Sequence, residues 1–109
     1  MNNLTVPILY NGKTHNLLFE GRYYFDRKFN TAFPCVYIIV QQTPQFGNKI
    51  IYVGITEDIN QRLENHHKVD CWRKYVTSHS LFILRQNNPS QRVLIESLII
   101  QQYNPPCNG

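Results

Sequence analysis

The chain has 109 residues, enough for one hydrophobic core and too few for two domains. Apolar residues make up 42% of it and charged residues 17%, a balance that excludes a disordered chain. No segment reaches the roughly 18 consecutive apolar residues of a membrane span, and residues 1–4 lack the pattern of a secretory signal. A formal net charge of +4 and a pI of about 9.1 favour polyanionic partners. Together these values predict a soluble, intracellular protein of the cytoplasm that does not attach to membranes.

Two extended runs, residues 4–10 and 16–25, flank Asn11-Gly12 near the N-terminus. Asn-Gly between such runs is a strong signal for a β-hairpin. Pro7 predicts that the first strand lies at a sheet edge, because proline has no backbone N–H to donate. Residues 26–34 then read as a polar connector that ends at a proline.

A second pair of strands follows. Residues 35–41 are almost continuously apolar and rich in β-branched side chains, which predicts a central strand. Residues 43–48 supply turn-forming side chains, and residues 49–54 form the returning strand. We expect these segments to form an antiparallel hairpin.

The next segment predicts a helix from Thr56, or from Asp58 as the alternative cap, to about Lys68. Arg62 and His66 are four residues apart and would therefore project from one face of this helix.

Residues 69–80 are ambiguous in their pattern. Trp72 and Tyr75 could anchor a short helix or cover one end of the core. Arg73 and Lys74 between these aromatic side chains resemble a nucleic-acid contact pattern, although an ordinary surface loop would look the same. Residues 81–86 predict a third strand.

The last helix starts at Asn88-Pro89 and runs to about Tyr103. Apolar residues occur on every side of it, which predicts a largely buried helix with Glu96 in its middle. A buried carboxylate is costly unless a metal ion, an arginine or a lysine compensates its charge. Arg92, one turn back, is the arginine alternative. Residues 104–109 read as a rigid, extended tail.

Three cysteines, Cys35, Cys71 and Cys107, are too few and too widely spaced to predict a disulfide framework. A zinc site could be imagined from His66, His67, Cys71 and His79. Their spacing matches no standard ligand pair, and structural zinc sites normally offer paired cysteines. We therefore expect solvated histidines and a half-buried thiol in this region.

These elements, in this order, resemble the GIY-YIG nuclease family over residues 34–109. The matching positions are Tyr37, Tyr52, Gly54, Arg62, His66, Glu96 and Asn108. Cys35 stands where the family has its first glycine, a departure that concerns backbone packing more than chemistry. The resemblance implies an α+β fold with a small, mainly antiparallel central sheet of three core strands, in the order β-β-α-β-α, flanked by helices. Residues 1–33 would be an N-terminal β-hairpin extension of this nuclease domain.

The resemblance also implies a metal-dependent endonuclease that hydrolyses phosphodiester bonds in DNA. Glu96 would hold a single Mg²⁺ or Mn²⁺ ion, Tyr37 would position or deprotonate the attacking water, and Arg62 would contact the phosphate. Tyr52 and His66 would orient water or phosphate or shuttle a proton, with Gly54 and Asn108 supporting the site. A base role for Tyr37 requires nearby positive charge to lower its pKa.

Nucleic-acid contacts outside the catalytic residues are expected at Arg22, Arg27, Lys28, Arg73 and Lys74. The N-terminal hairpin would extend the sheet, widen the DNA surface or form a homodimer contact, and a partner protein could supply specificity. Two other classes of function stay open: a non-catalytic nucleic-acid-binding protein with the same fold, and a protein-interaction domain. In both, Tyr37 and Tyr52 would be core aromatic residues.

Overall fold

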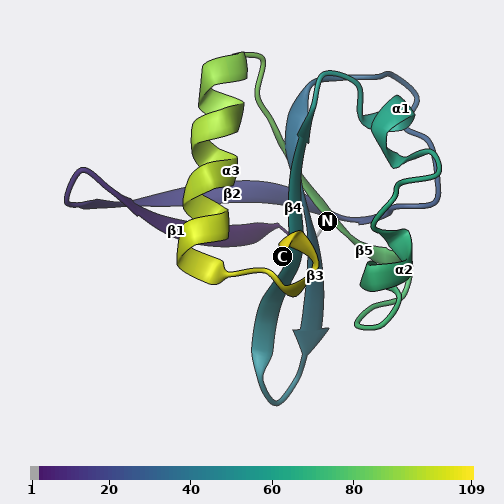
Figure 1. Cartoon of the computed structure of the whole chain (residues 1–109), viewed down its shortest axis with the longest axis horizontal. Coiled ribbons are helices and arrows are strands. Elements are labelled where there is room, and N and C mark those ends of the chain that lie inside the picture. Colours follow the sequence, from purple (N-terminus) through teal and green to yellow (C-terminus); the bar gives the residue numbers. More distant parts are fainter. Residues whose placement is uncertain (1–2) are drawn as a thin grey trace.

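A computed structural model describes residues 3–109 and contains one five-stranded sheet with helices on both faces (Figure 1). The strands follow one another in the order β1-β2-β5-β3-β4, and every pair of neighbours is antiparallel. Helix α3 covers one face, and the short helices α1 and α2 cover the other (Figure 1). The α+β fold class and the N-terminal hairpin that the sequence predicts are confirmed. No helix among residues 3–109 is both long and apolar enough to span a membrane.

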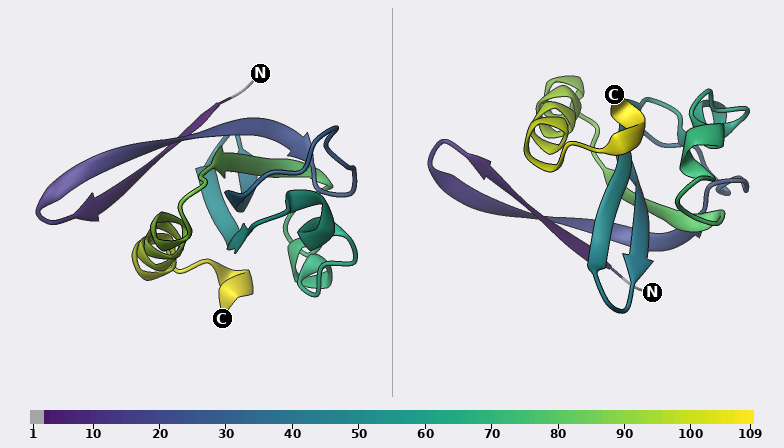
Figure 2. Two further views of the ribbon diagram at one scale, coloured as in Figure 1. Left: turned by 90° about the horizontal axis from the view of Figure 1, so that it is seen from above. Right: turned by 60° about the horizontal axis from the view of Figure 1, so that its bottom comes forward.

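The N-terminal hairpin consists of β1 (Leu4–Tyr10) and β2 (Lys13–Tyr24). Asn11 and Gly12 both have positive φ, which the tight turn requires, and β1 is the edge strand that Pro7 predicts. The second half of β2 pairs with β5 (His79–Arg85), so the extension joins the central sheet directly. Its far end runs out beside α3 (Figure 2).

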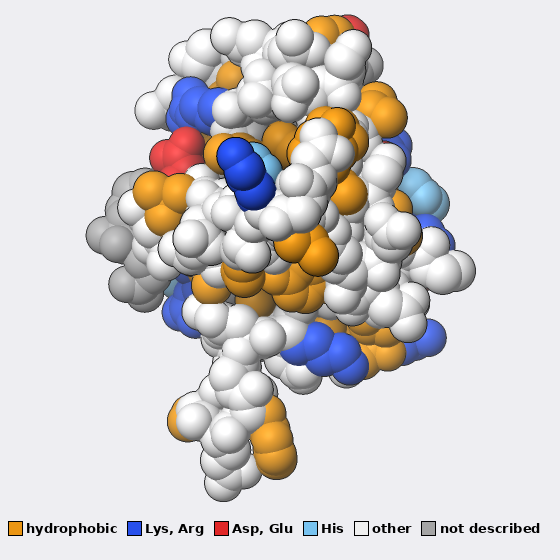
Figure 3. All heavy atoms as spheres, turned by 90° about the vertical axis from the view of Figure 1, so that its left-hand side faces the viewer, with side chains coloured by type: hydrophobic (Ala, Val, Ile, Leu, Met, Phe, Trp, Pro, Cys, Tyr) orange, Lys and Arg blue, Asp and Glu red, His pale blue; other side chains and the backbone are white. Residues whose placement is uncertain are grey.

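Strand β3 (Cys35–Thr43) is the centre of the fold, between β5 and β4 (Gly47–Thr56). Its first six residues are all buried and alternate between the two faces of the sheet. One face therefore receives Tyr37 and Ile39, and the other receives Val36 and Ile38. The tip of the β3–β4 hairpin projects from the body of the molecule (Figure 3).

Helix α3 (Pro89–Tyr103) has the predicted bounds, and the Asn88 side chain accepts the Gln91 N–H as its cap. The expectation that α3 is largely buried is wrong. Ile95 and Ile99 pack onto the sheet, whereas Val93 and Ile100 are 53% and 39% exposed. Only one side of α3 is covered by the sheet, so the apolar residues on its other sides stay exposed to solvent.

Helix α1 (Ile59–Leu63) is much shorter than predicted, and Asp58, the alternative cap, begins it. The chain leaves the helix at Glu64, and Asn65 adopts a left-handed conformation. A second short helix, α2 (Val69–Trp72), follows, with the Trp72 side chain fully buried. Both sequence alternatives for Trp72 therefore hold, because it lies in a short helix and covers the core.

The C-terminal tail departs from the sequence prediction in two ways. It is not extended, because Asn104 turns the chain left-handed and residues Pro106–Asn108 form a 3₁₀ turn, η1. In addition, Cys107 forms a disulfide with Cys71 of α2, so the expected thiol at Cys71 is wrong. Cys35 is the free, buried cysteine. The fold brings residues 36 positions apart together, a proximity that cysteine spacing alone could not indicate.

Candidate active site

The side chains of Arg62 and His66 meet at the hydroxyl group of Tyr37, which lies on a distant strand. Nε2 of His66 lies 2.8 Å from the Tyr37 oxygen, and Nε of Arg62 donates to the same oxygen at 3.2 Å. Tyr52 lies two register pairs away on the same face of the sheet, with its ring centroid 6.1 Å from that of Tyr37. Four of the residues singled out by the sequence pattern thus form one cluster.

His66 reaches this cluster by a different route from the one predicted. It does not share a helix face with Arg62, because α1 ends at Leu63 and the chain reverses through Asn65. His66 is also 6% exposed rather than solvated. The tertiary packing of its ring outweighs the helix propensity of residues 64–68. Arg62 and His66 are therefore brought together by the turn after α1 and not by their spacing on a helix.

The His66 ring sits among aromatic neighbours. The centroid of Trp72 lies 4.4 Å away, that of His67 4.7 Å, and that of Tyr52 5.3 Å. Burial lowers the pKa of His66 to about 4, and the positive charge of Arg62 acts in the same direction. The imidazole is accordingly neutral at pH 7. Sequence reasoning did not connect Trp72 with His66, and a lone tryptophan in an ambiguous segment offers no signal for that contact.

The hydrogen bonds of His66 define which ring nitrogen carries its proton. Nδ1 accepts the backbone N–H of Lys68 at 3.0 Å, so in the neutral ring the hydrogen is on Nε2. His66 therefore donates to Tyr37, as Arg62 does. Two donors at one phenolic oxygen favour its ionised form. Because Arg62 and His66 both donate to the Tyr37 oxygen, the hydroxyl hydrogen of Tyr37 cannot point at either of them.

The pKa of Tyr37 is nevertheless raised. Burial of the phenol is the largest cause, the Tyr52 hydroxyl adds to it, and Arg62 opposes it. The positive charge that a base role needs is present at Arg62, but it does not outweigh burial. Further positive charge at the site would have to lower this pKa.

Glu96 lies half-buried on α3, with no ion-pair partner among residues 3–109. The arginine alternative from the sequence is wrong: Arg92 donates to the Gln86 and Asn87 carbonyls and lies 3.8 Å from Glu57. Burial raises the pKa of Glu96, and the charge of Arg62 opposes the shift.

A divalent cation fits the donor set at Glu96. Its carboxylate is partly desolvated, and the charge of Arg62 only partly offsets this cost, so a bound cation would stabilise it. Within residues 3–109, His, Cys, Asp and Glu side chains nowhere gather in groups of three that could hold a metal ion. A cation at Glu96 would thus keep several waters and take substrate phosphate as a ligand, as Mg²⁺ commonly does.

Asn108 and Gly54 support β3 and β4, the strands that carry Tyr37 and Tyr52. The Asn108 side chain accepts the Val53 N–H and donates to the Val53 carbonyl, both at 2.9 Å, so it pairs with β4 like a strand neighbour. Gly54 pairs with Tyr37 across the hairpin, and a Cβ at Gly54 would overlap with the Tyr37 ring.

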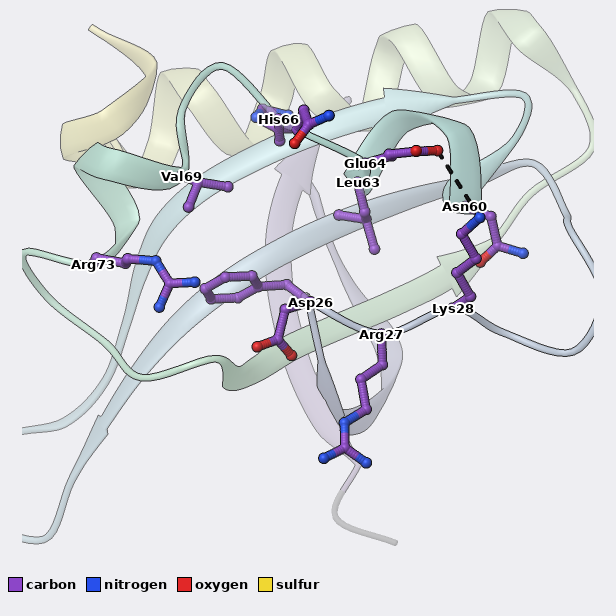
Figure 4. Close-up of a pocket in the computed structure, with 11 residues that line it drawn as sticks. Asp26, Arg27, Lys28, Asn60, Leu63, Glu64, His66, Val69 and Arg73 are labelled. Carbon is purple, nitrogen blue, oxygen red and sulfur yellow. Dashed lines mark ion pairs between the residues drawn. The ribbon is translucent and has the colours of Figure 1, made fainter.

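The basic residues expected to contact nucleic acid fall into different places. Arg27, Lys28 and Arg73 line one pocket together with His66 (Figure 4). Arg22 is exposed and lines two smaller hollows, one of which shares Arg27 and Lys28 with this pocket. Lys74 is exposed on the segment after α2. Three of the five cations therefore adjoin the cluster around Tyr37.

Comparison with known proteins identifies the domain. The family model described as the GIY-YIG catalytic domain matches residues 33–108. No curated protein sequence matches the chain. Two solved structures resemble it, both of the GIY-YIG N-terminal endonuclease domain of UvrC from Thermotoga maritima. Both are point mutants bound to the catalytic divalent cation.

The likeness to these structures extends over most of both chains. Sequence identity is 22% for one and 20% for the other, and the TM-score is 0.55 for each. The matched region covers 72% of this chain and 84% of each UvrC chain. At such identities the likeness establishes the fold, while the family model establishes the family.

Proposed function

Because the chain belongs to the GIY-YIG family and carries its catalytic domain, we propose that it is a metal-dependent endonuclease that hydrolyses phosphodiester bonds in DNA. One observation carries this proposal: Arg62 and His66 both donate to the Tyr37 hydroxyl. A core tyrosine would need one partner for its hydroxyl, whereas two donors, one of them cationic, suit an oxygen that must bear negative charge. The basic pI of about 9.1 fits a polyanionic substrate.

Each residue of the cluster has a role in this proposal. Arg62 is exposed at its outer edge and contacts the scissile phosphate through its planar guanidinium group. Tyr37 positions the attacking water with the help of its two donors, or removes the proton of that water once further positive charge at the site lowers the raised pKa of the phenol. Tyr52 and His66 orient water and phosphate around Tyr37.

Glu96 is the proposed ligand of a Mg²⁺ or Mn²⁺ ion. When bound, the ion would supply an electrophile for the charge that develops on the phosphate. Its positive charge would also compensate the carboxylate, whose pKa is raised by burial. Asn108 and Gly54 support the site through β4, one by pairing with Val53 and the other by admitting the Tyr37 ring.

The remaining part of the chain has a proposed role as well. Residues 34–109 would form the catalytic domain and residues 1–33 an extension that adds DNA-contacting surface. The pairing of β2 with β5 supports this arrangement, because it attaches the extension rigidly to the domain. Arg27 and Lys28 then lie on the pocket that includes His66.

A plasmid-nicking assay tests the function. The wild-type protein should nick supercoiled DNA with Mg²⁺ or Mn²⁺ and lose activity with a chelator. Glu96→Gln and Tyr37→Phe should each lower the rate by about a hundredfold or more, as removal of a group that stabilises the transition state typically does. Glu57→Gln removes a carboxylate whose side chain is 88% exposed and serves as the matched control.

The outcomes separate the classes of function. Tight DNA binding by the wild type without metal-dependent nicking would replace the nuclease proposal with a non-catalytic nucleic-acid-binding protein. Equal activity of the wild type and Glu96→Gln would exclude Glu96 as the metal ligand. Absence of DNA binding altogether would point to a protein-interaction domain.

A further inference from the structure

A pocket of about 550 Å³ adjoins the catalytic cluster on the side of the N-terminal extension (Figure 4). Its walls come from the β2–β3 connector, from the end of α1 with the turn that follows, and from α2. Its volume lies in the range of pockets that bind small organic groups, roughly 300–1,000 Å³. Six of its residues define its chemistry: Phe25, Arg27, Lys28, Asn65, His66 and Arg73.

The wall supplied by the extension is fixed in place. The Phe25 N–H donates to the Ser78 carbonyl at 2.9 Å. Phe29 and the Asn60 side chain exchange two hydrogen bonds, of 2.7 Å and 3.0 Å, which attach the connector to α1. Residues 25–28 lie before the segment matched by the family model, residues 33–108. This pocket is thus built partly by residues outside the GIY-YIG domain.

The charged side chains at the rim suit a nucleic-acid strand. Arg27, Lys28 and Arg73 are all exposed, against Asp26 and Glu64. Lys28 and Glu64 lie 4.0 Å apart with both side chains largely in solvent, so this pair is weak and can exchange for a phosphate. Three cations at one rim favour contacts to the sugar–phosphate backbone.

Arg73 offers a stacking surface as well as a charge. Its guanidinium carbon lies 5.4 Å from the centroid of the buried Phe25 ring, a cation–π contact that holds the planar group over the ring. The Arg73 side chain can be followed in the close-up, where it extends towards Asp26 (Figure 4). Nucleobases stack on guanidinium planes held in this way. Asn65 in the same pocket carries an amide that can bond to a base edge.

The pocket continues into the hollow that contains Arg62. That hollow, of about 470 Å³, shares Glu64, Asn65 and His66 with the larger pocket. A strand whose phosphate contacts Arg62 would therefore pass its neighbouring nucleotide across His66. The two hollows are therefore continuous along Glu64, Asn65 and His66.

Resting on the proposed nuclease function, we propose that this pocket binds an unpaired nucleotide adjacent to the cleaved phosphodiester. Its base stacks on Arg73, and its backbone phosphate is contacted by Arg27 and Lys28. A base in a duplex would first have to leave its stack, whereas a base in a single-stranded segment enters at little cost. The substrate class is then DNA in which a single-stranded segment flanks the cleavage site.

Two fluorescent DNAs of the same sequence test this proposal, one fully paired and one with a single-stranded segment at a duplex junction. Binding is measured by anisotropy in chelator and cleavage in Mg²⁺. The wild type should bind the junction at least about fivefold more tightly than the duplex, the range expected for one base stacked on a side chain. Arg73→Ala and Arg73→Lys should both abolish this preference, because each removes the guanidinium plane.

Lys49→Ala is the matched control, since it removes one exposed charge from β4, outside the N-terminal extension and absent from the walls of both pockets. Equal binding of the two DNAs by the wild type would overturn the pocket proposal, and so would a preference that survives in both Arg73 variants. Cleavage without that preference would leave the nuclease function standing and the pocket wrong. A preference lost in the Arg73 variants, but with no cleavage by the wild type, would leave the pocket standing and the nuclease function wrong.

Discussion

Tyr37 and Gly54 face each other across the β3–β4 hairpin, and the Tyr37 ring lies directly over the Gly54 backbone. A side chain at position 54 would overlap with the Cζ atom and the hydroxyl group of Tyr37. The missing Cβ thus lets the phenol reach across β4 to His66 and Arg62. Gly54 is required for space here rather than for backbone freedom.

Gly54→Ala should therefore damage both stability and activity. The added methyl group must push the buried Tyr37 ring aside, which we expect to cost about 1–3 kcal/mol of unfolding free energy, as overpacking in a core typically does. Because the displaced hydroxyl loses its alignment with Arg62 and His66, the nicking rate should fall by about tenfold or more. Urea denaturation and the plasmid assay measure the two effects.

The control for this prediction is Gly109→Ala. A Cβ at Gly109 would meet only a Pro106 carbonyl oxygen at 3.9 Å, an ordinary contact, so its stability should match the wild type. In a Tyr37→Leu background, which removes the hydroxyl and Cζ, the cost of Gly54→Ala should shrink. An undiminished cost there would mean that the alanine acts on something other than Tyr37.

The lowered pKa of the buried His66 side chain should make the folded protein less stable in mild acid. Its pKa in the folded protein is lowered to about 4, whereas the unfolded chain binds the same proton near 6.5. Between these values the unfolded state holds more protons, so stability that is present above about pH 6.5 falls as the pH drops towards 4. We expect this histidine to account for a decrease of about 1–2 kcal/mol in unfolding free energy.

The comparison that isolates this effect is the pH profile of His66→Gln. Glutamine can still donate to Tyr37 but cannot gain a proton, so the variant should show a shallower fall in stability between pH 6.5 and pH 4. Thermal unfolding at several pH values gives both curves. Parallel curves for the two proteins would rule out His66 as the source of the acid sensitivity.

The elements with strong local signals could be predicted from the sequence. Asn11-Gly12 indicated the first turn, the apolar run at β3 indicated the central strand, and Asn88-Pro89 indicated the start of α3. These signals depend on neighbouring residues alone, which is why their positions agree with the structure within a few residues. The family resemblance added the catalytic domain, because its residues are recognised by their type and order along the chain.

The remaining features depend on contacts between distant segments. The pattern of residues 56–68 favoured a continuous helix, but burial of His66 against Trp72 and Tyr52 ended α1 early. Only the folded chain shows that Arg92 bonds to the Gln86 and Asn87 carbonyls instead of pairing with Glu96. The Cys71–Cys107 disulfide belongs to the same class. No periodicity or spacing encodes such contacts, because the partners are determined by how the elements pack.

The disulfide connects two segments that both support the cluster. Cys71 precedes Trp72, whose buried ring packs against His66 and Tyr52. Cys107 precedes Asn108, whose amide pairs with Val53 next to Tyr52. Opening the disulfide would remove the covalent link between the tail and α2 and leave packing and the Asn108 hydrogen bonds to hold the tail. Trp72 and Val53, the two neighbours of Tyr52, would then be less firmly positioned.

A reductant should accordingly lower the thermal stability of the wild type and leave the Cys71→Ser, Cys107→Ser double variant unchanged. Closing a loop of this length, 36 residues, stabilises a protein by about 2–4 kcal/mol, so we expect a decrease of several degrees in Tm. The double variant should also nick DNA several-fold more slowly at a temperature where both proteins are folded. Thiol counting after denaturation provides the control: one reactive thiol, from Cys35, without reductant and three with it. Three thiols without reductant, or an equal response of the double variant to reductant, would contradict the disulfide's role.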